Sequence, residues 1–316
     1  KEEDFLHYYG YVLISIKLLF LMELVRKKSI NCNQGAIRAV RYNADGAYAM
    51  TCGSDKKIKL LNPLTETLLK TYGGHGDEVL DVVGSCDSSR ILSGSMDKSL
   101  IYWDVSTGQV IRRLRHHAGA VNSVKLNEES TVAVSGSRDN TVMCWDMRVP
   151  KMEPVQVMNE AKDSVIEVIV ANHRIIAASI DGSVRQYDIR AGEVITDSLD
   201  CAIVSIARTR DGQCLLLSCH DGIMRLMDND SGDILANYRG HTMMNYKVEC
   251  GIICSDSHVV SGSAEGVAVI WELVQGKEIR RIPIGNKVVH SIAVHPTGTD
   301  VIFACGPEIH VWGYPY

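Results

Sequence analysis

Several signatures of common enzyme classes are absent from this 316-residue chain. It contains no G-x-S-x-G, no H-E-x-x-H and no P-loop motif, so the familiar arrangements for serine hydrolysis, zinc proteolysis and nucleotide binding are missing. None of its ten cysteines forms a CxxC pair, and the formal net charge is −5. Without a basic excess, nothing in the composition calls for nucleic acid as a partner.

The cysteines have no spacing that is typical of a metal site. Cys250 and Cys254 stand four apart and Cys214 and Cys219 five apart, and most of the others lie in strand-like apolar runs. This usage predicts reduced, buried thiols in a cytoplasmic or nuclear protein, with no metal and no cofactor. Metal ligation is the alternative that the cysteines leave open.

A dipeptide position that recurs at near-constant spacing dominates what is present. The intervals between successive copies are 42, 42, 42, 40, 44 and 41 residues. The copies read Leu61-Asn62, Trp103-Asp104, Trp145-Asp146, Tyr187-Asp188, Met227-Asp228, Trp271-Glu272 and Trp312-Gly313. A period of about 40–45 residues that ends in Trp-Asp is the WD40 pattern, in which each repeat forms one four-stranded propeller blade. The sequence therefore predicts an all-β, seven-bladed WD40 propeller.

Within this frame three repeats carry the same polar set. An acidic residue stands six positions before the Trp, a serine four before the acid, and a histidine opens the repeat. The three sets are His75, Ser93, Asp97 and Trp103; His117, Ser135, Asp139 and Trp145; and His241, Ser261, Glu265 and Trp271. A catalytic Ser-His-Asp group would need an exposed hydroxyl and an oxyanion hole. Three copies at the repeat period instead favour buried hydrogen-bond relays that include the indole N–H.

The end of the chain predicts how the ring closes. The last repeat supplies three strands, and the chain stops four residues after Trp312. Residues 24–31 (LVRKKSIN) precede the first repeat in the phase of a fourth strand. We therefore expect the N-terminal strand to complete the last blade, so that the propeller covers residues 24–316. A basic linker at Arg26–Lys28 is the alternative.

Residues 1–23 form a leader that does not belong to the repeat. The stretch from Tyr11 to Met22 is apolar apart from Ser15 and Lys17, and the acidic start KEED does not suit a secretory signal. The apolar stretch is short for a membrane span. A helix packed on the propeller or on a partner, an optional or poorly ordered leader that Met22 could replace as a start, and a membrane segment are the three interpretations.

The wording of individual repeats is more specific than the general pattern. The informative strings are residues 35–46 (GAIRAVRYNADG), 51–64 (TCGSDKKIKLLNPL), 74–85 (GHGDEVLDVVGS), 153–165, 209–214 and 246–252. They resemble the family of the mitogen-activated protein kinase organiser, in order over residues 32–316. The resemblance implies a non-enzymatic WD-repeat scaffold tied to MAP-kinase signalling and to the spliceosome. The chain departs from the family at Leu61, at His116 and throughout the leader.

Blade geometry also predicts a face for partners. The residues that flank the first apolar position of each inner strand, and the residue before each turn acid, should surround one mouth of the central channel. The predicted rim comprises Arg38, Leu80, Met96, Arg138, Ile166, Ile180, Val204, His220 and Lys247. Exposed apolar area bordered by charge is typical of an interaction site. The alternative is that some of these residues are half-buried in the channel wall.

Two other functions compete with a scaffold. Trp145–Arg148 and Tyr187–Arg190 resemble the W-D-x-R box of substrate receptors of cullin-4 ubiquitin ligases. A propeller hydrolase is the rival of another class, but the rim positions hold a single carboxylate, Glu78, where such chemistry needs several. The run Arg112–His117 falls on an outer strand, where it could meet phosphate or form a solvated edge.

The sequence thus favours a scaffold that works in complexes of a kinase module or the spliceosome. Its expected partners are proteins, with no small-molecule substrate, no sequence-specific nucleic-acid binding and no membrane, and its expected location is the cytoplasm and the nucleus.

Overall fold

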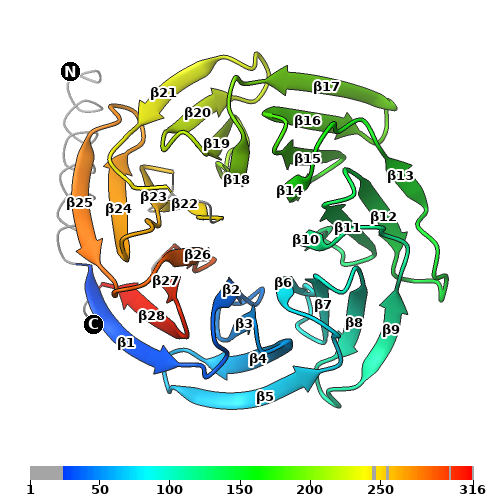
Figure 1. Ribbon diagram of the computed structural model, residues 1–316. Coiled ribbons are helices and arrows are strands. Elements are labelled where there is room, and N and C mark those ends of the chain that lie inside the picture. Colours follow the sequence, from blue (N-terminus) through cyan, green and yellow to red (C-terminus); the bar gives the residue numbers. More distant parts are fainter. Residues whose placement is uncertain (1–23, 244–246, 254–255, 299, 315–316) are drawn as a thin grey trace, which may run out of the picture.

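The computed structural model describes residues 24–243, 247–253, 256–298 and 300–314. These residues form seven four-stranded antiparallel sheets arranged as the blades of a ring (Figure 1). The predicted seven-bladed propeller is confirmed. The leader, residues 1–23, lies outside the described residues, so the interpretations of it remain predictions.

Each blade runs from an innermost strand at the central channel to an outer strand on the perimeter (Figure 1). The innermost strands are β2 (Ile37–Tyr42), β6 (Val79–Gly84), β10 (Val121–Leu126), β14 (Val165–Ala171), β18 (Ile203–Arg208), β22 (Cys250–Ile253) and β26 (Val289–Val294). The second strands are β3 (Ala49–Gly53), β7 (Arg90–Ser95), β11 (Val132–Ser137), β15 (Arg174–Ser179), β19 (Cys214–Cys219), β23 (His258–Ser261) and β27 (Asp300–Cys305).

The third strands carry the recurring Trp-Asp position. They are β4 (Lys57–Asn62), β8 (Leu100–Asp104), β12 (Val142–Asp146), β16 (Ser183–Asp188), β20 (Met224–Asp228), β24 (Val267–Glu272) and β28 (Glu308–Gly313). The outer strands are β5 (Thr67–Gly73), β9 (Val110–Leu114), β13 (Gln156–Met158), β17 (Glu193–Ser198), β21 (Ile234–Tyr238), β25 (Glu278–Pro283) and β1 (Val25–Asn31). We number the blades 1 to 7 from β2, so that β26, β27, β28 and β1 form blade 7.

The hydrophobic core lies between blades. Met50 and Tyr72 of blade 1, for example, share one cluster with Val82, Ile91 and Trp103 of blade 2. Neighbouring blades cover both faces of each sheet near the channel. The second strands are therefore nearly continuous apolar runs, and β3 is buried at all five positions. Each blade thus depends on its two neighbours for burial of its apolar faces.

The last blade closes the ring with strands from both ends of the chain. β1 pairs antiparallel with β28, from Val25 opposite Gly313 to Asn31 opposite Glu308. Lys27 and Asp300 form an ion pair of 2.9 Å at this seam, with both side chains only 11% exposed. The predicted closure by an N-terminal strand is confirmed, and it covers the edge of β28, so that blade 7 has four strands like the other six.

The described residues include no helix that is long and apolar enough to cross a membrane.

Deleting residues 1–32 should open the ring. The deletion removes β1 and exposes β28, which then offers unpaired backbone groups to other chains. We expect aggregation and loss of a cooperative thermal transition, measured by size-exclusion chromatography and circular dichroism. Deleting residues 1–21 keeps Leu24, which is buried in the cluster between blades 6 and 7, and is the matched control. A soluble, cooperatively unfolding chain without residues 1–32 would contradict the closure.

Candidate functional site: the mouth of the central channel

The nine predicted rim residues come together at one mouth of the central channel. All nine line a single hollow of about 560 Å³, and Glu78, Asn122, Ala202 and His290 complete its lining. Blades 2, 4 and 5 supply the five large apolar side chains, and the four charged or polar rim residues are Arg38, Arg138, His220 and Lys247. That the hollow binds a partner is not shown by its shape and remains a prediction.

A β-bulge explains why the inner-strand residues face the mouth. In blade 2 the pairing of β6 with β7 skips one residue, Leu80, between Val79 and Asp81. An extra residue of this kind re-aims its side chain out of the regular alternation. The same irregularity in other blades falls on Arg38, Asn122, Ile166, Val204 and His290.

A second backbone contact places the remaining rim residues. The N–H of Met96 donates to the Glu78 carbonyl at 2.9 Å, and the N–H of Arg138 donates to the Ala120 carbonyl at 2.9 Å. Equivalent bonds of 3.0 and 2.9 Å hold Ile180 and His220. The residue before each turn acid is thereby fixed beside the bulge residue of its own blade, which gives the rim a rigid backbone.

The floor of the mouth holds three acidic residues that the sequence analysis overlooked. Asp81, Glu167 and Glu249 occupy equivalent positions on the channel side of blades 2, 4 and 6, and all three are buried. Asp81 and Glu167 directly follow the rim residues Leu80 and Ile166, and Glu249 lies two residues after Lys247. The signal in the sequence was an acid within an apolar strand, as in VLDVV and VIEVIV.

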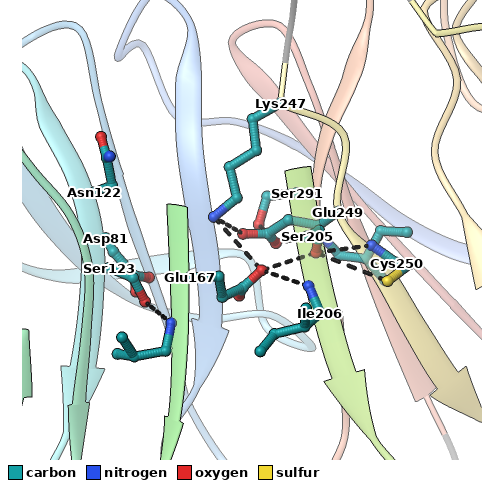
Figure 2. A network of polar contacts seen from close by, with 12 residues as sticks. Asp81, Asn122, Ser123, Glu167, Ser205, Ile206, Lys247, Glu249, Cys250 and Ser291 are labelled. Carbon is teal, nitrogen blue, oxygen red and sulfur yellow. Dashed lines mark hydrogen bonds and ion pairs between the residues drawn. The ribbon is translucent and has the colours of Figure 1, made fainter. Parts of the chain in front are cut away.

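These acids and three serines form a ring of polar contacts around the channel, and Figure 2 shows its members Asp81, Ser123, Glu167, Ser205, Glu249 and Ser291 from close by. The Asp81 carboxylate accepts bonds from the Ser123 hydroxyl and the Val124 N–H, at 3.2 and 3.0 Å. Glu167 does the same with Ser205 and Ile206, at 2.8 and 3.1 Å.

The third acid repeats the arrangement. Glu249 accepts from Ser291 and Ile292, at 2.5 and 3.1 Å. Each of the three acids therefore joins its own blade to the next blade of the ring.

The serines continue the ring to the following blades. The hydroxyl oxygens of Ser123, Ser205 and Ser291 accept from the N–H groups of Val168, Cys250 and Val40, at 3.3, 3.4 and 3.0 Å. Between blades 1 and 2 the link is ionic, since Arg41 Nη2 lies 2.9 Å from Asp81 Oδ1, without a well-directed hydrogen bond to that oxygen. Polar contacts thus join every blade to its neighbours at the channel.

Three cations neutralise the three carboxylates. Arg41 of blade 1 also binds Glu249 of blade 6 with two hydrogen bonds of 2.9 and 2.7 Å. Lys247 Nζ lies 3.4 Å from Glu249 and 3.8 Å from Glu167 (Figure 2), and Lys125 Nζ lies 3.7 Å from Asp81. Burial opposes charge on Glu249, but attraction to Arg41 and Lys247 and hydrogen bonds to the carboxylate outweigh it, so the pKa of Glu249 lies below its ordinary value.

This ring corrects the count of carboxylates on which the argument against a hydrolase rested. Asp81, Glu167 and Glu249 converge at the channel in addition to Glu78. A general acid, however, needs a raised pKa, whereas burial is outweighed at Asp81 by the attraction of Arg41, and the pKa of that carboxyl is lowered. The carboxylates of Asp81, Glu167 and Glu249 are occupied by serine, backbone and cation partners, and through these contacts they connect the blades.

The first two predicted relays are assembled inside their blades. In blade 2 the two ring nitrogens of His75 lie 3.1 Å from Asp97 Oδ2 and 2.8 Å from Ser93 Oγ, and the Trp103 indole N–H donates to Ser93 at 2.9 Å. Blade 3 repeats this geometry with His117, Ser135, Asp139 and Trp145 at 2.8–2.9 Å. Ser93 and Ser135 are fully buried, so neither hydroxyl can reach a substrate.

The third predicted relay is not formed. Trp271 donates to the Arg239 carbonyl, Ser261 to the Gly262 carbonyl, and the exposed Glu265 accepts from Thr242. His241 packs edge-on against Trp271, and neither of its ring nitrogens has a hydrogen-bond partner among the described residues. In this blade the histidine stands 24 residues before the acid, compared with 22 in blades 2 and 3.

Other blades hold the turn acid with residues that the sequence analysis did not single out. In blade 1 the Gln34 amide donates to Asp55 at 3.2 Å, and its oxygen accepts from Thr51. In blades 4 and 5 an arginine four positions after the acid takes the place of the histidine. Arg185 binds Asp181 at 2.8 Å, and Arg225 binds Asp221 at 2.6 Å.

The cysteines of the described part are nine free thiols. Among the residues that the structure describes, one group, Cys201, Cys219 and Asp221, has potential metal-binding atoms within 4.8 Å of one another. Arg225 occupies the Asp221 carboxylate with two hydrogen bonds, so the geometry gives no support to a metal there.

The outer-strand run Arg112–His117 is solvated in part: Arg115 and His116 are exposed, whereas Arg112 and Arg113 are half-buried and bind neighbouring carbonyls. Arg112 donates to the carbonyls of Met147 and Val149 in the next blade, and Arg113 to the carbonyl of Gly74. Both side chains tie β9 to its surroundings and are not free to meet phosphate. In the W-D-x-R segment Arg148 folds back onto Asp146 at 2.7 Å, although its side chain remains 68% exposed.

Replacing Asp97 by alanine should destabilise blade 2. The change leaves His75, the Gly76 N–H and Ser99 without their acceptor, and an unpaired buried polar group costs about 1–3 kcal/mol. Glu265→Ala is the matched control, because Glu265 is exposed and such positions change stability by less than about 0.5 kcal/mol. Urea unfolding measures both; equal losses for the two variants would contradict the relay.

His241 should make the protein sensitive to mild acid. Burial lowers the pKa of His241 to about 4, from 6.5. Between these values the unfolded chain binds a proton that the folded chain does not, so the free energy of unfolding falls as the pH drops from 6.5 toward 4. The loss is roughly 2 kcal/mol at pH 5. We expect His241→Phe to remove this part of the pH dependence in melts at pH 7.5 and pH 5; parallel curves for the two proteins would refute it.

Comparisons with known proteins agree with this architecture. The family model for the WD domain, G-beta repeat, matches residues 24–62, 66–104 and 108–146. WD repeat domain-containing protein 83 of Rattus norvegicus is 50% identical over 92% of this chain and 93% of its own length, and the protein of that name from Homo sapiens is 48% identical over 91% of each. A homolog from Dictyostelium discoideum is 31% identical over 92% of this chain and 99% of its own. The chain belongs to the family of WD repeat domain-containing protein 83.

Proposed function

We propose that this protein is a non-enzymatic scaffold that holds proteins together in intracellular complexes of MAP-kinase signalling or pre-mRNA splicing, in the cytoplasm and the nucleus. The observation that carries the proposal is the hollow at the channel mouth, where five large apolar side chains surround a rigid opening. The resemblance of the repeat sequences to the MAP-kinase organiser family supports the choice of complexes.

The physical argument for a scaffold is that the mouth offers binding area without reactive groups. Leu80, Met96, Ile166, Ile180 and Val204 come from blades 2, 4 and 5, and Ile180 is 39% exposed. The backbone of these residues is already held by the inner-strand bulges and the turn hydrogen bonds, so that the binding of a partner does not have to order it. The carboxylates beneath them are bound in ion pairs, so the surface recognises a partner but has no evident means of transforming it.

Replacing Ile180 by aspartate should detach at least one partner. A buried apolar anchor typically contributes about 2 kcal/mol or more, which is more than a tenfold loss of affinity. We expect the variant to keep the thermal stability of the parent, because Ile180 lies in an exposed turn, and to lose that partner in affinity purification with quantitative mass spectrometry.

The matched control is Ile189→Asp. Ile189 is 53% exposed and lies at the other end of β16 from Ile180, away from the mouth. If the Ile180 variant keeps every partner while the Ile189 variant loses one, the binding surface is the opposite face and the proposal is wrong.

A further inference from the structure

Charge at the mouth is balanced except at one residue. Arg38 is paired with Glu78 at 2.9 Å, Lys247 with Glu249 at 3.4 Å, and Arg41 and Lys125 with carboxylates of the channel ring. Each of these cations therefore already has a carboxylate of this chain beside it. Arg138, in contrast, forms no ion pair with any residue that the structure describes.

Arg138 is held in a defined position without being neutralised. Its Nε donates to the Asn122 side-chain oxygen at 3.3 Å, and Asn122, which is 8% exposed, donates in turn to the Val165 carbonyl at 2.8 Å. Together with the backbone bond from Arg138 to Ala120, these contacts fix the base of the side chain. The two terminal guanidinium nitrogens remain available for a ligand.

Apolar groups stand on both sides of this arginine. Blade 2 contributes Leu80 and Met96, blade 4 contributes Ile166 and Ile180, and Arg138 of blade 3 lies between them in the same hollow. A guanidinium grips a carboxylate with two parallel hydrogen bonds, and the interaction strengthens where apolar neighbours exclude water. A ligand for this arrangement combines one carboxylate with aliphatic side chains next to it.

We propose that the mouth binds an acidic peptide segment of a partner protein, in which Asp or Glu is flanked by aliphatic residues and its carboxylate is read by Arg138. The proposal rests on the scaffold function, and it names the chemistry of the partner. A single guanidinium suits a singly charged carboxylate better than a phosphate, since phosphate sites in proteins usually gather several arginines.

The test uses the full chain and a displayed library of random nonapeptides. Panning against the parent protein should enrich peptides with Asp or Glu within two residues of Leu, Ile or Met. One enriched peptide is then made with a fluorescent label, together with versions in which the acid is replaced by its amide or by phosphoserine. Fluorescence anisotropy should show at least tenfold weaker binding of the amide version, because it loses the charge-assisted pair, and no gain for phosphoserine.

Variants of the protein assign the effect to Arg138. Arg138→Glu should lose the peptide, and Arg138→Lys should bind it more weakly than the parent, because lysine keeps the charge but not the planar fork. Arg190→Glu is the matched control: Arg190 is exposed, lies at the far end of β16, and should leave binding unchanged. Thermal melts check that each variant is folded.

Several results would overturn the proposal. These are panning without enrichment, enrichment of basic or purely apolar peptides, tighter binding of phosphoserine, and equal affinity of the parent and Arg138→Glu for the acidic peptide. The scaffold function fails separately, when Ile180→Asp keeps all partners in cells. If Ile180→Asp loses a partner while Arg138→Glu still binds the peptide, the mouth is a docking surface but acidic recognition is wrong.

Discussion

Alternation of acid and serine at the channel is the interaction on which the rest of this propeller depends. Every inner strand places polar backbone groups against the next blade. The strands of neighbouring blades diverge there, so the backbone hydrogen bonds within one sheet cannot satisfy the polar groups of the next. Asp81, Glu167 and Glu249 accept an N–H from the following blade, and the serines that bind them do the same one blade further on. These contacts give the buried carboxylates and serines of the ring polar partners, and at Asp81 Oδ1 the partner is the charge of Arg41 instead of a directed hydrogen bond.

The same ring determines what the mouth can be. In blades 2 to 5 and in blade 7 the bulge residue directly precedes a ring residue, as Leu80 precedes Asp81 and Ile166 precedes Glu167. Because cations of the same chain neutralise the acids below, the rim can be apolar without lying over uncompensated charge. Arg138 departs from this balance: blade 3 has a serine at the ring position and an asparagine at the bulge, and neither offers a carboxylate to the arginine beside them.

Periodicity decided how much could be predicted from the sequence. The repeats, the closure by β1, the two relays built on His75 and His117, and the nine residues at the mouth all follow from positions that recur at one spacing, and the structure brings each of these sets together. The relay predicted for blade 6 was wrong. Its histidine is two residues further from the acid than in blades 2 and 3, and Trp271 donates to a backbone carbonyl. Blade 6 has the same four residue types as blades 2 and 3, but their side chains do not form the relay.

The ring of acids and serines was missed in the sequence for a different reason. Its members alternate between blades, so no single repeat contains the motif, and an acid such as Glu167 looks like an isolated exception in an apolar strand. Gln34, Arg185 and Arg225 were missed because they do with other chemistry what His75 does in blade 2. A search for one residue type misses different residues that form the same contact. A search for the hydrogen-bond partner of each turn acid would have found these three.

The seam in blade 7 also has a mechanical consequence. In the antiparallel pair of β1 and β28, Val25 lies opposite Gly313, so the two chain ends leave the seam at the same end of the ladder. A force that separates the ends would peel these strands apart one hydrogen bond at a time, in place of shearing all of them at once. The ion pair between Lys27 and Asp300 lies near the end where peeling would begin. Tension between the two ends would therefore separate β1 from β28 in blade 7 first, before the force acts on the other six blades.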